Sequence, residues 1–95
     1  MAIVMILRWP GFTTAQYDAA RKVIDMDGNE PAGLLTHVAW PEADGYHVVD
    51  TWNTAEEFNR YVEQRLMPAM KRLNIPGEPE VQIHPVHATL NPRSK

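Results

Sequence analysis

Alternating apolar and polar blocks divide the chain into six predicted elements. Residues 2–9 are almost continuously apolar and β-prone, and they stop at a Pro-Gly pair. Such a run is typical of a strand that is covered on both faces. Thr13 and Gln16 then form a capping-box pattern, which predicts a helix that continues to a turn at residues 27–29.

Three further segments are predicted to be strands. Residues 33–40 and 46–52 are rich in apolar and β-branched side chains, and a turn at residues 41–45 separates them. The last predicted strand covers residues 80–88. Pro85 interrupts it, and because proline cannot donate to a sheet ladder, this position belongs at a sheet edge or a bulge.

A long amphipathic helix is predicted between the third and fourth strands. Thr54 and Glu57 form a second capping box at its start. Pro68 lies inside the pattern, and the apolar stripe keeps its phase on both sides of it, so we expect a kink there and not a helix end. The stripe consists of Phe58, Tyr61, Val62, Leu66, Ala69, Met70 and Leu73.

The resulting order β-α-β-β-α-β predicts an α+β fold of the ferredoxin-like type. Its sheet would have four antiparallel strands, with both helices on one face. Because 95 residues are about the size of one domain, we expect residues 1–90 to form a single domain. Residues 91–95 form a polar C-terminal tail in this prediction.

The third predicted strand indicates that the sheet is covered on both faces. Large aromatic residues lie on one of its faces and a valine on the other, without the alternation of a one-sided sheet. Two helices cover only one face, so a second copy of the chain is expected to cover the other, which predicts a homodimer through the sheet. The face assigned to the dimer contact carries Tyr46, Val48, Asp50 and Trp52.

Composition narrows the possible functions. The chain has 9 Lys and Arg against 12 Asp and Glu, a net charge of −3, so no basic patch for nucleic acid is expected. The longest apolar run is too short to span a bilayer, and no membrane partner is expected. The absence of cysteine fits a reducing compartment, and we expect a cytoplasmic protein. Ser94 is the only serine, which argues against a serine-nucleophile hydrolase.

The segment that links the third strand to the second helix resembles the dimeric α+β barrel superfamily. That group includes antibiotic-biosynthesis monooxygenases, haem-degrading monooxygenases and a polyketide cyclase. The resemblance implies a small-molecule pocket between helices and sheet in each subunit, while the chemistry differs between members. The shared pattern, acidic-x-Trp-x-Ser/Thr-x-Glu-x-Phe, is filled here by Asp50, Trp52, Thr54, Glu56 and Phe58.

Two histidines are the first candidates for chemistry in this pocket. If the hairpin turn centres on Ala43, His37 and His47 lie on one face as diagonal neighbours, about 7–8 Å apart. Two imidazoles there could orient a phenol or exchange a proton near neutral pH. The alternative is a pair of half-buried structural histidines. Asp50 lies on the opposite face of the strand, with Trp52, and its charge is expected to be buried there. A buried carboxylate needs a partner, for which Arg8 or Arg65 are candidates.

The resemblance also implies roles for single residues. Tyr61 matches a tyrosine in the active site of the cyclase, and His47 matches a pocket histidine. The helical histidine of the cyclase, its general base, falls at Met67 here, which argues against cyclase chemistry. The helical histidine of the haem-degrading members has its nearest counterpart at Lys71, so no haem and no other cofactor is expected. We therefore name His37, His47 and Tyr61 as candidate catalytic residues. Expected substrate contacts are Trp9, Tyr17, Thr51 and Phe58.

No metal site is expected from the sequence. His84 and His87 are three residues apart, which on a strand places them on opposite faces, and no third ligand is suitably spaced. The predicted function is binding of an aromatic or polyketide-like small molecule, or a cofactor-independent reaction on it. The alternative is a non-catalytic dimeric accessory module. A cavity of roughly 300 Å³ or more would favour the ligand site, and a solid core the alternative.

Overall fold

The computed structural model describes residues 1–90 and has the predicted order of elements. The predicted tail, residues 91–95, lies outside the described residues. The elements are β1 (Ile3–Pro10), α1 (Thr14–Ile24), β2 (Leu34–Glu42), β3 (Gly45–Trp52), α2 (Ala55–Tyr61), the π-helical turn η1 (Val62–Leu66), α3 (Met67–Arg72) and β4 (Glu80–Pro85).

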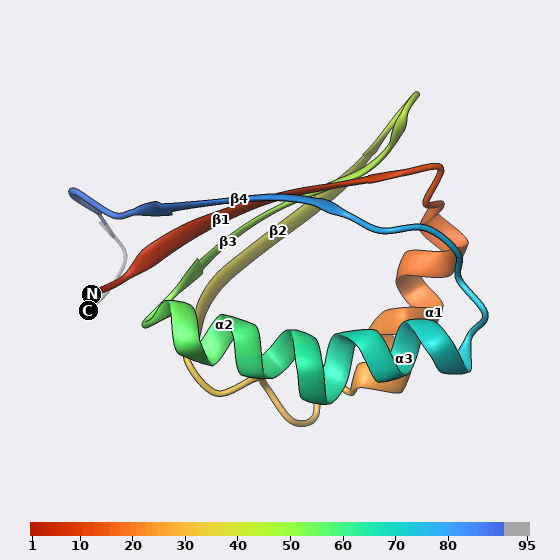
Figure 1. Cartoon of the computed structure of the whole chain (residues 1–95), viewed down its shortest axis with the longest axis horizontal. Helices are drawn as coiled ribbons and strands as arrows, with labels where there is room; N and C mark the ends of the chain where they lie inside the picture. Colours follow the sequence, from red (N-terminus) through yellow and green to blue (C-terminus); the bar gives the residue numbers. More distant parts are fainter. Residues whose placement is uncertain (91–95) are drawn as a thin grey trace.

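The four strands form one antiparallel sheet in the order β2-β3-β1-β4. All helices lie on the same side of this sheet, and its other side is open in the single chain (Figure 1). The predicted ferredoxin-like fold is therefore confirmed. β4 is an edge strand and ends at Pro85, which agrees with the position predicted for that proline.

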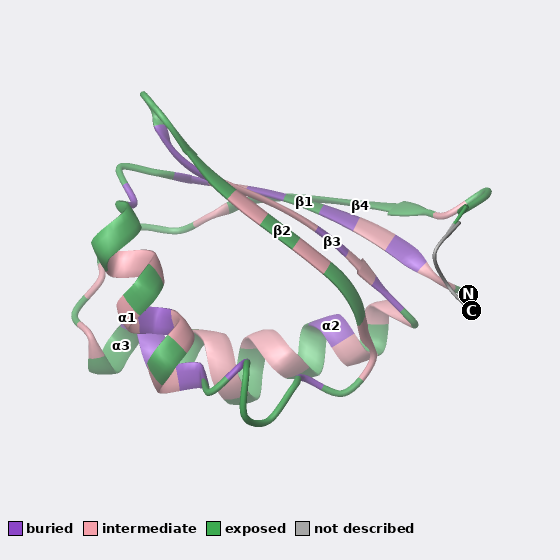
Figure 2. Ribbon diagram, turned by 180° about the vertical axis from the view of Figure 1, so that it is seen from behind, coloured by how far each residue is buried: buried purple, intermediate pink, exposed green. Residues whose placement is uncertain are grey.

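Strand β1 shows which side of the sheet is the interior. Its odd-numbered residues from Ile3 to Trp9 are buried against the helices, whereas Ile6 on the opposite side is 40% exposed (Figure 2). Successive strand residues point to opposite faces. We call the helix-covered side the inner face and the open side the outer face.

The face assigned to the dimer contact is wrong. The predicted dimer-contact residues of β3 lie on the inner face, where the helices cover them, and Trp52 is fully buried. The outer face instead carries an apolar row across three strands, formed by Ile6, Val49 and Val38 as cross-strand partners. The apolar surface that a second copy could cover therefore lies on the side predicted to face the pocket.

The register of the β2–β3 hairpin also differs from the prediction, and it sets which residues of the two strands share a face. Glu42 pairs with Gly45, so the turn contains only two residues, Ala43 and Asp44, and the pairing is shifted by one residue from the prediction. A shift of one residue exchanges the two faces of a strand. His37 therefore pairs with Asp50 on the inner face, and the predicted diagonal pair of histidines does not form.

Helix α1 begins as the sequence predicts. The Thr13 hydroxyl accepts from the Gln16 N–H and the Gln16 side chain accepts from the Thr13 N–H, which completes the capping box. The helix ends at Asp25, which adopts a left-handed conformation (φ 61°) before the predicted turn.

The long second helix continues through Pro68, as predicted, but it accommodates the proline by a π-helical turn. The Met67 N–H bonds to the Val62 carbonyl, five residues back, directly before Pro68. Proline offers no N–H and its ring crowds the preceding turn, and the wider π turn relieves this conflict. Within the described residues, no helix is both long and apolar enough to cross a membrane.

Candidate functional site

A small cavity lies between the helices and the inner face of the sheet. Its volume is about 70 Å³, and its wall is mainly aromatic and aliphatic. Three methionines contribute to this wall: Met5 from β1, Met26 from the loop after α1, and Met70 from α3. Polar side chains enter the wall at few positions, and these are Tyr17, Arg21, His37, Tyr46, Asp50 and Tyr61.

A chain of hydrogen bonds runs along the polar part of the wall. The Tyr17 hydroxyl lies 2.7 Å from His37 Nε2, and His37 Nδ1 lies 2.6 Å from Asp50 Oδ1. The Trp52 indole donates to the second Asp50 oxygen at 3.2 Å. At the other end, Arg21 Nη1 donates to the Tyr17 oxygen at 3.0 Å. One helix and two strands therefore supply a continuous Arg-Tyr-His-Asp arrangement.

The hydrogen-bond partners of His37 determine which ring nitrogen carries the proton when the imidazole is neutral. The Asp50 carboxylate can only accept, so His37 carries its proton on Nδ1 and donates it to Asp50. His37 Nε2 is then an acceptor, and the Tyr17 O–H donates to it. The Tyr17 oxygen accepts from Arg21 and keeps one lone pair free for a further donor.

The charged end of this row of hydrogen bonds is buried, which is uncommon for a carboxylate. The side chains of Asp50 and His37 are 5% and 16% exposed, and Asp50 is the buried charged residue of the described core. Burial raises the pKa of the Tyr17 phenol, while the hydrogen bond from Arg21 opposes that rise. Tyr17 therefore stays protonated near neutral pH and can donate to His37.

Tyr61 lies on another part of the cavity wall. Its ring contacts Trp52, with 5.2 Å between ring centroids, and it occupies the last position of α2 before the π turn. Burial, followed by the nearby Asp50 charge, raises the pKa of Tyr61. Its hydroxyl forms no hydrogen bond with any residue between 1 and 90. Single π turns within helices are frequent at functional sites.

Three of the four predicted substrate contacts line the cavity, and the fourth lies on the outer face. Trp9, Tyr17 and Phe58 all line the cavity. Thr51 does not, because it lies on the outer face, where its hydroxyl is 2.6 Å from that of Thr36. Its assignment to the pocket is therefore wrong, and the cause is again that the predicted face of β3 was the opposite one.

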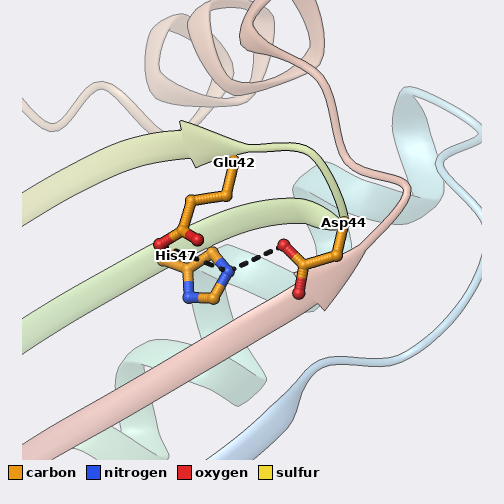
Figure 3. A group of neighbouring side chains, drawn as sticks. All are labelled: Glu42, Asp44 and His47. Atoms are coloured by element: carbon orange, nitrogen blue, oxygen red, sulfur yellow. Dashed lines mark hydrogen bonds and ion pairs between the residues drawn. The ribbon is translucent and has the colours of Figure 1, made fainter.

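His47 also lies on the outer face, outside the cavity. Its Nε2 is 3.0 Å from Asp44 and 3.9 Å from Glu42, at the tip of the β2–β3 hairpin (Figure 3). Potential ligand atoms of these three residues lie within 4.8 Å of one another. Both carboxylates already have other donors, because Asp44 accepts from Arg8 and Glu42 from Trp40. The arrangement is that of a surface ion-pair network.

The partners expected for Asp50 are also wrong. Arg8 lies on the outer face and pairs with Asp44 and Glu80. Arg65 donates to the backbone carbonyls of Ile24 and Asn29 and so holds the loop after α1. His37 takes the place expected for an arginine beside Asp50.

Sequence reasoning missed the Tyr17–His37–Asp50 chain, although its signals are present. The His37–Asp50 pair follows from a two-residue hairpin turn. Tyr17 and Arg21 are four residues apart on α1, and residues at this spacing lie on the same helix face.

Comparisons with solved structures show many proteins of the same fold. SnoaB, a cofactor-independent oxygenase from Streptomyces nogalater, superposes with a TM-score of 0.66 at 17% identity, over 94% of this chain and 96% of that one. A protein of unknown function from Nitrosomonas europaea gives a TM-score of 0.72 at 13% identity, over 98% and 96%. A candidate antibiotic biosynthesis monooxygenase from Chloroflexus aurantiacus gives 0.60 at 15%, over 94% and 97%.

The chain has the same fold as these proteins, a four-stranded antiparallel sheet with its helices on one face (Figure 1). The resemblance read from the strand-to-helix segment is thereby confirmed at the level of the fold. No family model matches the sequence, and no curated protein matches it significantly. Identities this low carry the architecture from one protein to another but leave the chemistry to be argued from the site.

Proposed function

We propose that the protein binds an aromatic hydroxy compound in the inner cavity and removes a proton from it without a cofactor. The observation that carries the proposal is the hydrogen-bonded chain of Tyr17, His37 and Asp50 on the wall of an apolar cavity. A base in such a place can act on a ligand that is shielded from water, where proton transfer is not in competition with bulk solvent.

The proton would move along the chain in one direction. The ligand hydroxyl or acidic C–H gives its proton to the Tyr17 oxygen, while the Tyr17 proton moves to His37 Nε2. The products are the ligand anion, a neutral Tyr17 and an imidazolium at His37. Asp50 stabilises that imidazolium through the bond at Nδ1, and the fixed Arg21 donor helps to stabilise negative charge at the Tyr17 oxygen.

The comparison with SnoaB supports this choice of reaction type. That protein is described as a cofactor-independent oxygenase. Formation of a ligand anion is a step that proton transfer, isomerisation and cofactor-independent oxygenation have in common. The aromatic wall, which includes Trp9, Phe12 and Tyr46, suits a planar ligand.

The cavity must widen before it can hold such a ligand. Its volume of about 70 Å³ is well below the roughly 300 Å³ typical of small-molecule sites. The wall residues Met5, Met26 and Met70 are unbranched and flexible, and methionine side chains adapt readily to a new shape. In the proposal, the ligand binds by displacing these side chains.

The small volume also favours a second candidate, a non-catalytic dimeric module whose core its own side chains fill. We propose a homodimer for both candidates, formed through the outer face. Its apolar row leaves Ile6 at 40% and Val38 at 58% exposure in the single chain, an arrangement that marks an interaction surface. The two candidates differ in whether the inner cavity takes a ligand.

Hydrogen–deuterium exchange tests the proton-transfer proposal directly. The probe is 1,3-dihydroxynaphthalene, and the rate of exchange at its C2 position is followed by NMR in D₂O. We expect the protein to accelerate exchange and His37→Ala to remove the acceleration, because the proton then has no acceptor. His47→Ala is the matched control and should keep it. Equal rates with and without the protein, together with no calorimetric binding, would favour the non-catalytic module.

A further inference from the structure

A polar cleft adjoins the inner cavity beside His37. It lies between the loop after α1 and the first part of β2, and its volume is about 260 Å³. Arg21, Met26 and His37 line both the cavity and the cleft. The two spaces therefore share three side chains, one of which is a flexible methionine.

The charged groups of the cleft have an acidic excess. Arg21 is already engaged, since its Nε and Nη2 donate to the two oxygens of Asp27 at 3.0 and 2.7 Å. Glu30 also lines the cleft and forms no ion pair with any residue in the described part of the chain. The formal charge of the lining is thus −1, and the carboxylate without a partner is that of Glu30.

We propose that cavity and cleft form one composite ligand site, which takes a phenol ring inside and a positively charged amine substituent in the cleft. This inference rests on the proposed function, because it assumes that the ring enters the inner cavity. It adds the substrate class, a phenol with a short aminoalkyl chain, and it assigns Glu30 as the residue that selects the charge of that chain.

Met26 is the flexible residue among the three that line both spaces. The inner cavity alone is too small for a ring, whereas cavity and cleft together reach the size of an ordinary small-molecule site. Met26 is buried, at 8% exposure, and belongs to the loop and not to a helix. A rotamer change of this side chain would join the two spaces without moving α1 or the sheet.

Three phenols that differ mainly in the end group test the charge preference. The probes are tyramine, with an amine, 2-(4-hydroxyphenyl)ethanol, with a hydroxyl, and 3-(4-hydroxyphenyl)propionate, with a carboxylate. Calorimetry at low salt is expected to give the lowest Kd for tyramine and the highest for the propionate. Glu30→Gln should weaken tyramine binding by about two- to fivefold, the size expected for one exposed ion pair. The effect should shrink at high salt.

Two control variants locate these effects. Glu63→Gln makes the same charge change on an exposed residue that lines neither space, and it should leave all three Kd values unchanged. Met26→Ala and Met70→Ala remove the same side chain, but Met70 lines only the inner cavity. Stopped-flow association of tyramine should become faster in Met26→Ala than in Met70→Ala, because Met26 must move to join the two spaces as well as to widen the cavity, and binding that waits for a conformational change is slow. Thermal melts establish that each variant is folded.

The outcomes separate this inference from the proposed function. If all three phenols bind with the same Kd, or if Glu30→Gln and Glu63→Gln behave alike, the composite site is wrong while ligand binding in the cavity stands. If 1,3-dihydroxynaphthalene and the three phenols all fail to bind, the proposed function fails, and the composite site with it. Tighter binding of the propionate would overturn the assigned charge preference.

Discussion

His37 and His47 lie on the same hairpin, and each is bonded to a carboxylate, yet their surroundings differ. The His37–Asp50 distance is 2.6 Å and the His47–Asp44 distance 3.0 Å. Asp50 is 5% exposed and, among residues 1–90, its side chain is bonded further only to Trp52, whereas Asp44 is 42% exposed and also pairs with Arg8. The burial of the carboxylate, more than that of the imidazole, distinguishes the two sites.

This difference determines what each pair can do. A surface carboxylate exchanges its partners with water and salt, so its pairs contribute little free energy. A buried carboxylate has no such replacement, and loss of its partner leaves an uncompensated charge. The inner pair can therefore hold a proton relay in a fixed geometry, while the outer pair serves as one of several interchangeable contacts.

A second copy of the chain on the outer face would have the largest effect on the contrast between the His37 and His47 sites. Sedimentation equilibrium at micromolar concentration should give about twice the chain mass of 10.8 kDa. Val38→Asp places a charge in the apolar row and should shift the protein to the single-chain mass. In the dimer the His47 site would be partly covered, and the contrast with His37 would become weaker. A wild-type protein that sediments as a single chain would contradict the dimer and keep the contrast complete.

Removal of each carboxylate compares the two sites directly. Asp50→Ala leaves the buried donors of His37 and Trp52 without a partner, and we expect a loss of about 3 kcal/mol in the free energy of unfolding. The matched change Asp44→Ala should cost clearly less, because water and salt ions can replace the partners of an exposed carboxylate. Urea denaturation followed by tryptophan fluorescence measures both. Equal losses would show that burial of the carboxylate does not distinguish the sites.

The order of elements could be predicted because its signals are local. The capping residue Thr13, the phase of the stripe around Pro68 and the proline of the edge strand each act within a few residues. All three placements agree with the structure. Tyr61 and Phe58 were placed on the cavity side by the same helical spacing.

The site could be predicted only in part because strand faces depend on the register. One residue in the length of the hairpin turn decides whether His47 and Thr51 share a face of the sheet with His37. The same residue decides that Asp50 meets His37 and not an arginine. Which face the helices then cover depends on packing across the whole domain, and no short sequence pattern reports it.

The hydroxyl groups of the two faces offer a smaller comparison. Tyr17→Phe removes the bonds to His37 and Arg21, and we expect a loss of about 1 kcal/mol, or a Tm lower by about 4–8 °C. Thr36→Val breaks the hydroxyl contact with Thr51 on the outer face, where water can replace it, and it should change the Tm by less. Scanning calorimetry of both variants gives the two values. A larger effect of the threonine change would reverse the contrast.

The smallest expected effect is the pH dependence of the outer site. Hydrogen bonds from Arg8, and then from His47, lower the pKa of Asp44 to about 2. In the unfolded chain this group has its ordinary, higher pKa, so its contribution to stability is present above about pH 4 and is lost as the pH falls through about 2. Asp44→Asn lacks this contribution. The Tm difference between wild type and Asp44→Asn should therefore shrink between about pH 5 and about pH 2, and it should be smaller throughout at high salt. A difference that stays constant over this range would show that the Asp44 carboxylate gains nothing from its neighbours on the outer face.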